Sequence, residues 1–199
     1  MKKNLSLTQT LPYILLVGGI IGVFSAGKLI VEKIYLLQNP GAQLGCDLNP
    51  VVACGSVITT PQASLFGFPN PIIGLVGFSA VAFIGLGMLA GARYKRWFWL
   101  VLQVAVSLGV AFVFWLQFQG LYRINALCPY CMVVWAMMIP IFWYVTLYNF
   151  QQNHFRVASR YKSILGFIQR HHGDILFAWF LIIVGAILHR FWYYWSTVI

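Results

Sequence analysis

Four cysteines, arranged as two pairs, are the residues of this chain whose types and spacing could do chemistry. Cys46 and Cys54 form a Cys-x7-Cys pair, and Cys128-Pro129-Tyr130-Cys131 forms a Cys-x-x-Cys motif at the start of an apolar stretch. A cysteine thiolate attacks a disulfide through a mixed disulfide, so neighbouring pairs can pass electrons to one another. The pattern predicts two redox-active pairs that work in series.

The Cys-x-x-Cys spacing has a physical reason. Cys128 can be the N-cap of a helix, Pro129 suits the first helical position, and Cys131 then lies one turn in, on the same side. Two cysteines placed in this way can be bridged with modest adjustment. The unpaired N–H groups and the positive end of the helix dipole favour a thiolate. We therefore expect a lowered pKa for one of these two sulfurs.

Three other readings of the cysteines compete with the redox one. Covalent haem attachment needs His after the second cysteine, but Met132 stands there. A zinc site made of all four cysteines would depart from the usual short spacing in the first pair, so we expect no metal. Two purely structural disulfides are the strongest alternative. Against them, a bundle of membrane helices satisfies its backbone internally and gains little from a bridge across one helix turn.

The composition predicts the elements that position these cysteines. The chain has 199 residues, of which 61% are hydrophobic and only 8% are charged, which is too apolar for a soluble domain. A spanning helix needs roughly 20 mostly apolar residues. Five stretches meet this need, at about 11–37, 71–91, 97–118, 128–148 and 175–194. We expect one all-α membrane domain over residues 1–199 with five transmembrane helices.

The first apolar stretch could also be a cleaved signal peptide. It follows Lys2 and Lys3 and passes through Phe24-Ser25-Ala26-Gly27, which resembles a cleavage region. Apolar residues continue beyond Gly27 as far as Leu37, which favours a retained helix.

The distribution of Lys and Arg predicts the orientation in the membrane. The side with the N-terminus would carry Lys2, Lys3, Arg93, Lys95, Arg96, Arg156, Arg160, Lys162 and Arg170, and the other side Lys33, Arg123 and Arg190 near helix ends. The N-terminus is therefore expected in the cytoplasm, with the C-terminus and all four cysteines outside. The net charge of +10 then reflects topology, and no nucleic-acid partner is expected.

The connection at 38–70 is the external loop that carries the first cysteine pair. Disulfides persist on the outer side of a membrane, which agrees with the redox reading. A connection of this length is uncommon in a compact protein and is usually functional. Its segment 61–68 is small and apolar enough to lie on the membrane surface as a lid over the bundle.

The same residues resemble the vitamin K epoxide reductase family, and most of all its bacterial branch. The matching segments are Cys46-Asp47 followed by Cys54, Thr59-Thr60, Phe68-Pro69-Asn70-Pro71-Ile72-Ile73-Gly74 and Cys128-Pro129-Tyr130-Cys131. The resemblance implies a four-helix bundle around a quinone, which is menaquinone or ubiquinone, with the loop as a cap and the fifth helix outside.

The resemblance also implies an activity. Electrons would come from a thioredoxin-like (DsbA-like) thiol oxidase to the Cys46/Cys54 disulfide, Cys54 would exchange with Cys128, and the Cys128/Cys131 disulfide, with Cys131 nearer the ring, would pass two electrons to the quinone. Such a thiol:quinone oxidoreductase drives disulfide formation in exported proteins at the cell (inner) membrane. Some relatives carry a fused thioredoxin-like domain after the fifth helix, whereas this chain ends at Ile199, so a separate partner protein is expected.

The resemblance places Asn70, Thr60, Ile58 and Trp135 around the quinone. Asn70 would hydrogen-bond a quinone carbonyl, although Asn-Pro is also a common turn dipeptide. Trp135 stands where animal members share a Tyr. Reduction of vitamin K quinone or its epoxide is a further activity of the family, and the missing hydroxyl at Trp135 argues against the epoxide step.

Two alternatives concern the whole protein. A transporter or scaffold with structural disulfides would need ionisable groups or broken helices at the membrane midplane, and the sequence offers no convincing ones. An inward electron flow would need a redox group on the inner side, whereas all four cysteines lie outside. Beside Cys46, Asp47 either disfavours the neighbouring thiolate or keeps the loop solvated.

Overall fold

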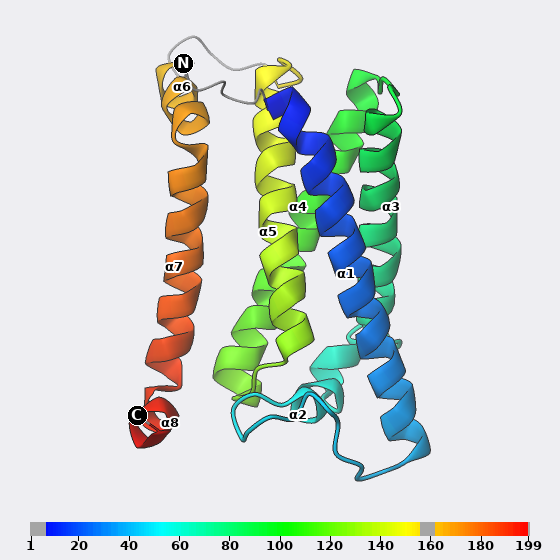
Figure 1. Cartoon of the computed structure of the whole chain (residues 1–199), viewed down its shortest axis with the longest axis vertical. Coiled ribbons are helices and arrows are strands. Elements are labelled where there is room, and N and C mark those ends of the chain that lie inside the picture. The colour runs from blue at the N-terminus through cyan, green and yellow to red at the C-terminus, as the bar shows by residue number, and fades with distance from the viewer. Residues whose placement is uncertain (1–6, 156–161, 199) are drawn as a thin grey trace.

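A computed structural model describes residues 7–155 and 162–198, and these ranges are almost entirely helical (Figure 1). Outside the described residues lie Lys2, Lys3, Arg156 and Arg160, four of the basic residues on which the predicted orientation rests. Within the described ranges the only extended pairing is one isolated parallel bridge, between Val52 and Leu127. The all-α prediction is confirmed.

Within the described residues, five helices are long and apolar enough to cross a membrane. They are α1 (Leu7–Gln38), α3 (Pro71–Leu89), α4 (Arg96–Gln119), α5 (Pro129–Gln151) and α7 (His172–Arg190). Each overlaps one of the five predicted segments, so the protein is a multi-pass membrane protein. Apolar stretches of this length form helices in a bilayer because every backbone N–H and C=O is then bonded within the segment.

Two predicted segments end differently in the structure. The segment predicted at 97–118 continues past α4 into one π-helical turn, η2 (Gly120–Ile124), which ends at Asn125 in the left-handed conformation. The segment predicted at 175–194 is two helices, because α7 stops at Arg190 and α8 (Trp192–Val198) follows. Phe191 lies between them, and its side chain is fully buried.

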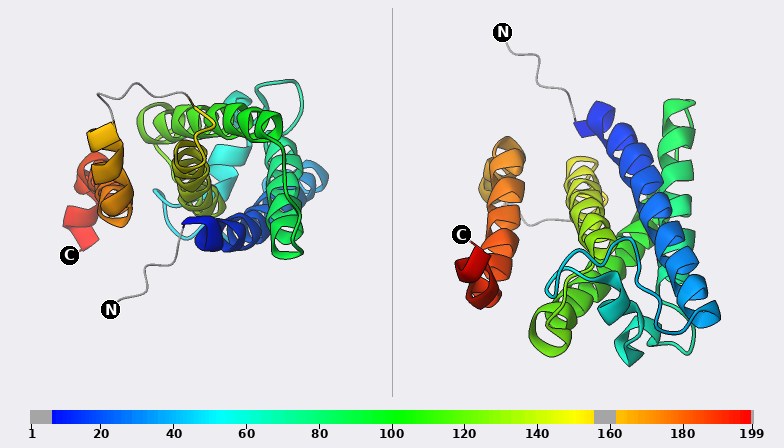
Figure 2. Two further views of the ribbon diagram at one scale, coloured as in Figure 1. Left: turned by 90° about the horizontal axis from the view of Figure 1, so that it is seen from above. Right: turned by 60° about the horizontal axis from the view of Figure 1, so that its bottom comes forward.

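The bundle consists of α1, α3, α4 and α5, with α1 packed along α3 and α5, and α4 along α5 (Figure 2). Its main core combines apolar side chains from all four helices: Leu11, Leu15, Phe78, Val81, Trp99, Leu102, Val106, Ile141 and Val145. Glycines let α1 and α3 approach closely. A Cβ atom on Gly85 would lie 2.6 Å from the backbone nitrogen of Leu16, and one on Gly19 would lie 2.8 Å from the Cα of Ala82.

The fifth long helix, α7, stands beside the bundle, as predicted (Figures 1 and 2). None of its residues is buried, and apolar side chains such as Phe177 and Ile182 point outward, where lipid would surround them. Polar contacts attach it at both ends. Trp143 donates to the carbonyl of His172 over 3.1 Å, and Arg190 donates to the carbonyl of Leu121 over 3.0 Å. The short helix α6 (Lys162–Arg170) precedes it.

The loop at 39–70 covers one end of the bundle and is more ordered than the sequence suggested (Figure 2). It contains the helix α2 (Cys54–Ile58) and the 3₁₀ turn η1 (Pro61–Ser64). Two backbone hydrogen bonds attach it to the bundle: Ala53 donates to the carbonyl of Leu127 over 2.9 Å, and Leu127 donates to that of Val51 over 2.7 Å. Ala53 directly precedes Cys54 in the chain, and Leu127 directly precedes Cys128.

The glycine contact between α1 and α3 predicts the effect of one added methyl group. Gly85→Ala should lower the free energy of unfolding by about 1–3 kcal/mol, because the new Cβ would overlap backbone atoms of α1 that cannot move independently. Thermal unfolding in detergent measures this. Gly77→Ala is the matched control on the same helix, since nothing lies within 4 Å of its Cβ position. Equal melting temperatures for the two variants would contradict the close-packing account.

Candidate redox site

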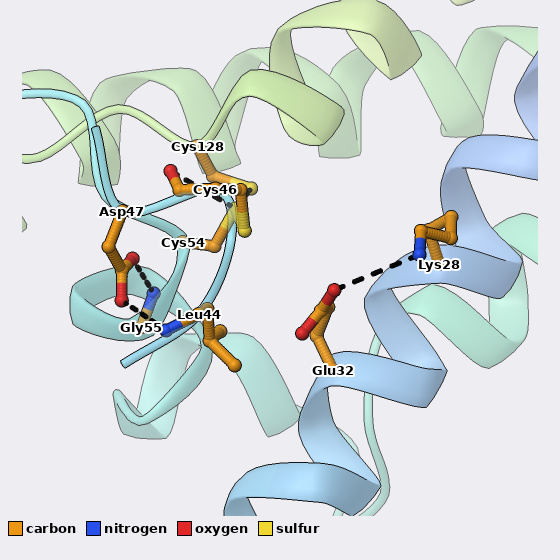
Figure 3. Close-up of a disulfide and its surroundings, with 8 residues drawn as sticks. All are labelled: Lys28, Glu32, Leu44, Cys46, Asp47, Cys54, Gly55 and Cys128. Atoms are coloured by element: carbon orange, nitrogen blue, oxygen red, sulfur yellow. Dashed lines mark hydrogen bonds and ion pairs between the residues drawn. A yellow bond between two sulfur atoms is a disulfide. The ribbon is translucent and has the colours of Figure 1, made fainter. Parts of the chain in front are cut away.

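Three of the four cysteine sulfurs meet at one place beneath the loop (Figure 3). Cys46 and Cys54 form a disulfide with 5.7 Å between their Cα atoms, and the sulfur of Cys128 lies 3.5 Å from that of Cys54. The two pairs predicted from the sequence are therefore in direct contact. Cys128 and Cys131 are free thiols here, whereas the resemblance implied a disulfide between them. This is a difference in redox state. The structure has the loop pair oxidised to a disulfide and the α5 pair reduced to two thiols.

Cys128 occupies the predicted N-cap position of α5. Pro129 follows at the first helical position, and the backbone N–H of Met132 donates to the carbonyl of Cys128 over 3.0 Å. The pKa of the Cys128 thiol is lowered, mainly because the Cys131 thiol donates a hydrogen bond to it, and further because the backbone N–H groups of Cys131 and Tyr130 point at it. Burial and the negative charge of Asp47 oppose this shift. The expected lowering of one sulfur's pKa is thus found at Cys128.

The contact between the pairs is shielded from solvent. Cys54 is 0% exposed and Cys128 is 1% exposed, while Cys46 retains 7%. The sulfurs share an apolar cluster with Leu29, Leu44 and Ile58. A thiolate in such a place meets the neighbouring sulfur rather than soluble thiols, because exchange requires access. Of the two cysteines in the loop disulfide, Cys46 is the one closer to solvent.

Helix α2, which begins at Cys54, is held at both ends. At its start, the carboxylate of Asp47 accepts hydrogen bonds from the backbone N–H of Gly55 over 2.8 Å and from that of Leu44 over 3.1 Å. At its end, the ammonium of Lys33 donates to the carbonyl of Ile58 over 2.8 Å. Asp47 thus caps the helix that starts at Cys54, a role that neither sequence interpretation of this residue had included.

Lys33 is a site residue that the sequence reasoning missed. The sequence places it only among the basic residues near helix ends, and nothing local distinguishes it from Lys28. In the structure Lys28 pairs with Glu32 across 3.9 Å, while Lys33 reaches across to α2 (Figure 3 shows the Lys28–Glu32 pair beside the disulfide). The available signal was the position of Lys33 in the last turns of α1, shortly before the cysteine loop.

The four residues predicted around the quinone lie in different surroundings. Asn70 is buried at the start of α3, where its amide donates to the carbonyl of Gln62 over 2.7 Å and its oxygen accepts from the N–H of Leu65 over 3.0 Å. The hydroxyl of Thr60 donates to the carbonyl of Val57 over 2.8 Å. Both side chains therefore stabilise the fold of the loop.

The other two predicted residues are buried apolar side chains. Ile58 belongs to the cluster around Cys54 and Cys128. Trp135 belongs to a second cluster, with Leu127 and Phe191, and Cys131 lies between the two clusters because it packs against both. Cys131 therefore contacts both the cluster that contains Ile58 and the cluster that contains Trp135.

The residue types near the sulfurs fit a quinone ring, but the space is narrow. A pocket of about 20 Å³ lies beneath the loop, lined by Leu29, Lys33, Ile58, Ala63, Pro69 and Pro71. Apolar walls with a few polar groups are what ring-shaped ligands meet in proteins. A space of this size holds about one water, so a ring could enter only with an outward shift of the η1 segment. Among the described residues, no three His, Cys, Asp or Glu side chains are placed to hold a metal.

The helical membrane fold and the contact between the two cysteine pairs define the class of the protein, that of multi-pass membrane proteins with paired cysteines at one end of a helical bundle. Residues 13–146 match the Vitamin K epoxide reductase family, and the protein belongs to this family. A search of curated proteins gave no match. Membership indicates an oxidoreductase.

The hydrogen bond from Cys131 predicts the pH dependence of Cys128. Cys131→Ala removes the largest cause of the lowered pKa, so less thiolate should be present at neutral pH and alkylation of Cys128 at pH 7 should slow severalfold. Mass spectrometry of the peptide with Cys128, after chloroacetamide treatment across a pH series, gives the midpoint of the reaction. That midpoint should move upward in Cys131→Ala and stay in place in Met132→Leu. A common midpoint for all three proteins would rule out the proposed hydrogen bond.

Proposed function

We propose that this protein is a thiol:quinone oxidoreductase that reoxidises a separate thioredoxin-like partner and passes the electrons through its two cysteine pairs to a membrane quinone. The observation that carries the proposal is the buried contact of 3.5 Å between the sulfurs of Cys54 and Cys128. Two purely structural disulfides would not require any contact between the sulfurs of different pairs. A relay between pairs requires it, because the mixed disulfide forms between these two atoms.

The first transfers take place in the loop and at the contact. A dithiol partner reduces the Cys46–Cys54 disulfide and becomes oxidised. The Cys54 thiolate then attacks Cys128, so that the Cys54–Cys128 bond forms, the Cys128–Cys131 bond breaks and Cys131 leaves with the electron pair. Cys46 attacks Cys54 next, which restores the loop disulfide and releases Cys128. The arrangement with an oxidised loop and two thiols at α5 is the product of these steps.

The lowered pKa of Cys128 supports this direction. A thiol with a lower pKa leaves faster, so release of Cys128 from the mixed disulfide with Cys54 is favoured. Cys128 and Cys131 then return to the disulfide, giving up two electrons and two protons. A bound quinone, menaquinone or ubiquinone, accepts both and leaves as the quinol. Asn70 uses one amide hydrogen for the loop and has a second one that can be donated to a carbonyl oxygen.

The position of the sites supports an extracytoplasmic reaction in the cell (inner) membrane. Arg93, Lys95, Arg96 and Arg170 belong to the end of the molecule opposite the cysteine loop, the end at which α1 begins (Figure 1). The excess of basic residues marks the cytoplasmic side of membrane proteins. The cysteines then face the compartment in which exported proteins acquire disulfides, and Cys46 is the entry point for electrons from the partner.

Quinone reduction by the purified protein tests the proposal directly. Stopped-flow absorbance with a reduced thioredoxin-like protein should show quinol formation by the wild type and none by Cys131→Ser, because the pair at α5 can no longer close. Cys54→Ala should block reduction by the partner, while the pair Cys128/Cys131 still reacts with quinol. Full turnover by Cys54→Ala with the partner would exclude a relay in series.

Trapping the mixed disulfide tests the contact itself. The double variant Cys46→Ala/Cys131→Ser keeps Cys54 and Cys128, and on oxidation these should form the mixed disulfide nearly completely. Trypsin cleavage at the basic turn of residues 93–96 separates the two cysteines, so a non-reducing gel reports the link. Cys46→Ala/Cys128→Ser keeps Cys54 and Cys131 and is the matched control. Equal cross-linking in both variants would mean that Cys54 does not select Cys128.

The contact from Lys33 to α2 predicts a positioning role. Lys33→Met removes the hydrogen bond to the carbonyl of Ile58, so Cys54 is held less firmly, and exchange between the pairs should slow about fivefold, in line with a contribution of about 1 kcal/mol from one hydrogen bond. Stopped-flow measurement of single-turnover exchange gives this rate. Lys28→Met is the control, because Lys28 contacts Glu32 and not α2. If exchange slowed equally in Lys33→Met and Lys28→Met, the loss of a positive charge would explain the effect, and the positioning role of Lys33 would be wrong.

A further inference from the structure

A second cavity lies far from the sulfurs. It has a volume of about 440 Å³ and is partly open, at the end of the bundle where α1 begins. Ligand sites of proteins commonly have volumes of about 300–1,000 Å³. The cavity is lined by the start of α1, the turn between α3 and α4, and the ends of α4 and α5: Thr8, Pro12, Met88, Gly91, Ala92, Arg93, Tyr94, Trp99, Tyr148, Gln152 and His154. Nothing in the redox relay uses it.

Hydrogen bonds hold one wall of this cavity in place. The guanidinium of Arg96 donates twice to the backbone carbonyl of His154, over 3.0 and 2.7 Å. The imidazole of His154 contacts the side-chain oxygen of Asn149 over 2.8 Å, and the amide of Asn149, which is fully buried, donates to the oxygen of Gln103 over 2.9 Å. The turn after α5 is thereby fixed to α4. The cavity is a formed feature of the fold.

The charges around the cavity favour an anion. Arg93 lines it, and Arg93 forms no hydrogen bond or ion pair with another described residue. No acidic residue lines the cavity. Glu32 and Asp47 lie at the opposite end of the bundle, and Asp174 is on α7, within 3.0 Å of His171. A cation without a protein partner in a cavity is a ready contact for a phosphate oxygen.

The remaining walls offer a hydrogen-bond acceptor and apolar surface. Because the oxygen of Asn149 can only accept, His154 donates through Nδ1, and the Nε2 of the neutral ring is an acceptor for a hydroxyl group. Burial and the charge of Arg96 lower the pKa of His154, so the ring is neutral at physiological pH. Trp99 and Tyr148, with ring centres 4.4 Å apart, form an aromatic wall.

We propose that this cavity binds the headgroup of an anionic phospholipid, with the phosphodiester at Arg93 and a headgroup hydroxyl at His154. A basic pocket between membrane helices at the cytoplasmic side is a common lipid-headgroup site. The cavity lies at the ends of four apolar helices, α1, α3, α4 and α5, and is partly open, which is the place expected for the headgroup of a lipid in the adjoining leaflet. This inference goes beyond the proposed redox function, and its tests measure binding, so either proposal can fail without the other.

Nuclear magnetic resonance of the full chain locates the site. With ¹³C-labelled methionine methyl groups, titration of the detergent-solubilised protein with short-chain phosphatidylglycerol should shift the resonance of Met88, which lines the cavity. The resonances of Met132, Met137 and Met138 on α5 should stay in place. Met88→Leu assigns the signal. Shifts of all these resonances together would indicate general detergent replacement and would overturn the proposal.

Variants of the basic turn test the charge contact. Arg93→Gln should weaken phosphatidylglycerol binding about fivefold, since one basic side chain contributes roughly 1 kcal/mol to binding of an anionic lipid. Lys95→Gln removes the same charge from the same turn but does not line the cavity, so its affinity should stay within about twofold of the wild type. Native mass spectrometry measures both. Equal loss in the two variants would mean that surface charge alone attracts the lipid.

Other ligands distinguish the source of the phosphate. Phosphatidylcholine should bind at least fivefold more weakly than phosphatidylglycerol, and inorganic phosphate or glycerol phosphate at millimolar concentration should leave the Met88 resonance unchanged. Equal binding of phosphatidylcholine would overturn the selectivity for anionic lipids. If free phosphate saturates the site and phosphatidylglycerol binds no more tightly than phosphate, the ligand is a small anion and the proposal of a lipid site is wrong.

Discussion

The site depends on two backbone hydrogen bonds that join the cysteine loop to the start of α5. Ala53 donates to Leu127, and Leu127 donates to Val51, so the residues before Cys54 and before Cys128 lie side by side. The next residue on each segment then brings its sulfur to the same point, 3.5 Å from its counterpart. Backbone bonds of this kind are insensitive to side-chain rotamers and to the redox state of the sulfurs. In the proposed relay, they would keep the two segments together while the disulfides change partners.

The two helices that begin at these cysteines are supported in different ways. Helix α5 is a long membrane helix whose place is set by packing against α1 and α4, so Cys128 is fixed by the bundle. Helix α2 is a single short turn of five residues, too short to be stable in isolation. Hydrogen bonds with Asp47 at its start and with Lys33 at its end stabilise this short helix. The charged residues at the cysteine end of the bundle thus hold α2, and with it Cys54, beside Cys128.

The sequence predicted the features that depend on neighbouring residues alone, namely the long helices and the start of α5. The five helices follow from apolar length, and the N-cap position of Cys128 follows from Pro129 and the spacing to Cys131. The lowered pKa of Cys128 was expected for the same reason, although the hydrogen bond from Cys131 is its largest cause. The contacts of Lys33 with Ile58 and of Asn149 with Gln103 were not predictable, because each joins segments that only the folded bundle brings together. The roles proposed for Asn70, Thr60, Ile58 and Trp135 stay predictions from the resemblance.

In the proposed relay, the hydrogen bond from Cys131 to Cys128 would give the two exchange steps an order. During the first exchange Cys128 is bonded to Cys131 in a disulfide and is attacked by Cys54. Cys131 has no S–H group at this stage and cannot donate a hydrogen bond. That attack frees Cys131, and its thiol, once protonated, can donate to Cys128. The second exchange therefore releases Cys128 at the moment when a hydrogen bond to its thiolate has become available, and a better-stabilised thiolate leaves faster. In a site where Cys54 and Cys128 are almost fully shielded from water, solvent cannot supply this stabilisation, so the neighbouring thiol and the first backbone N–H groups of α5 must do so.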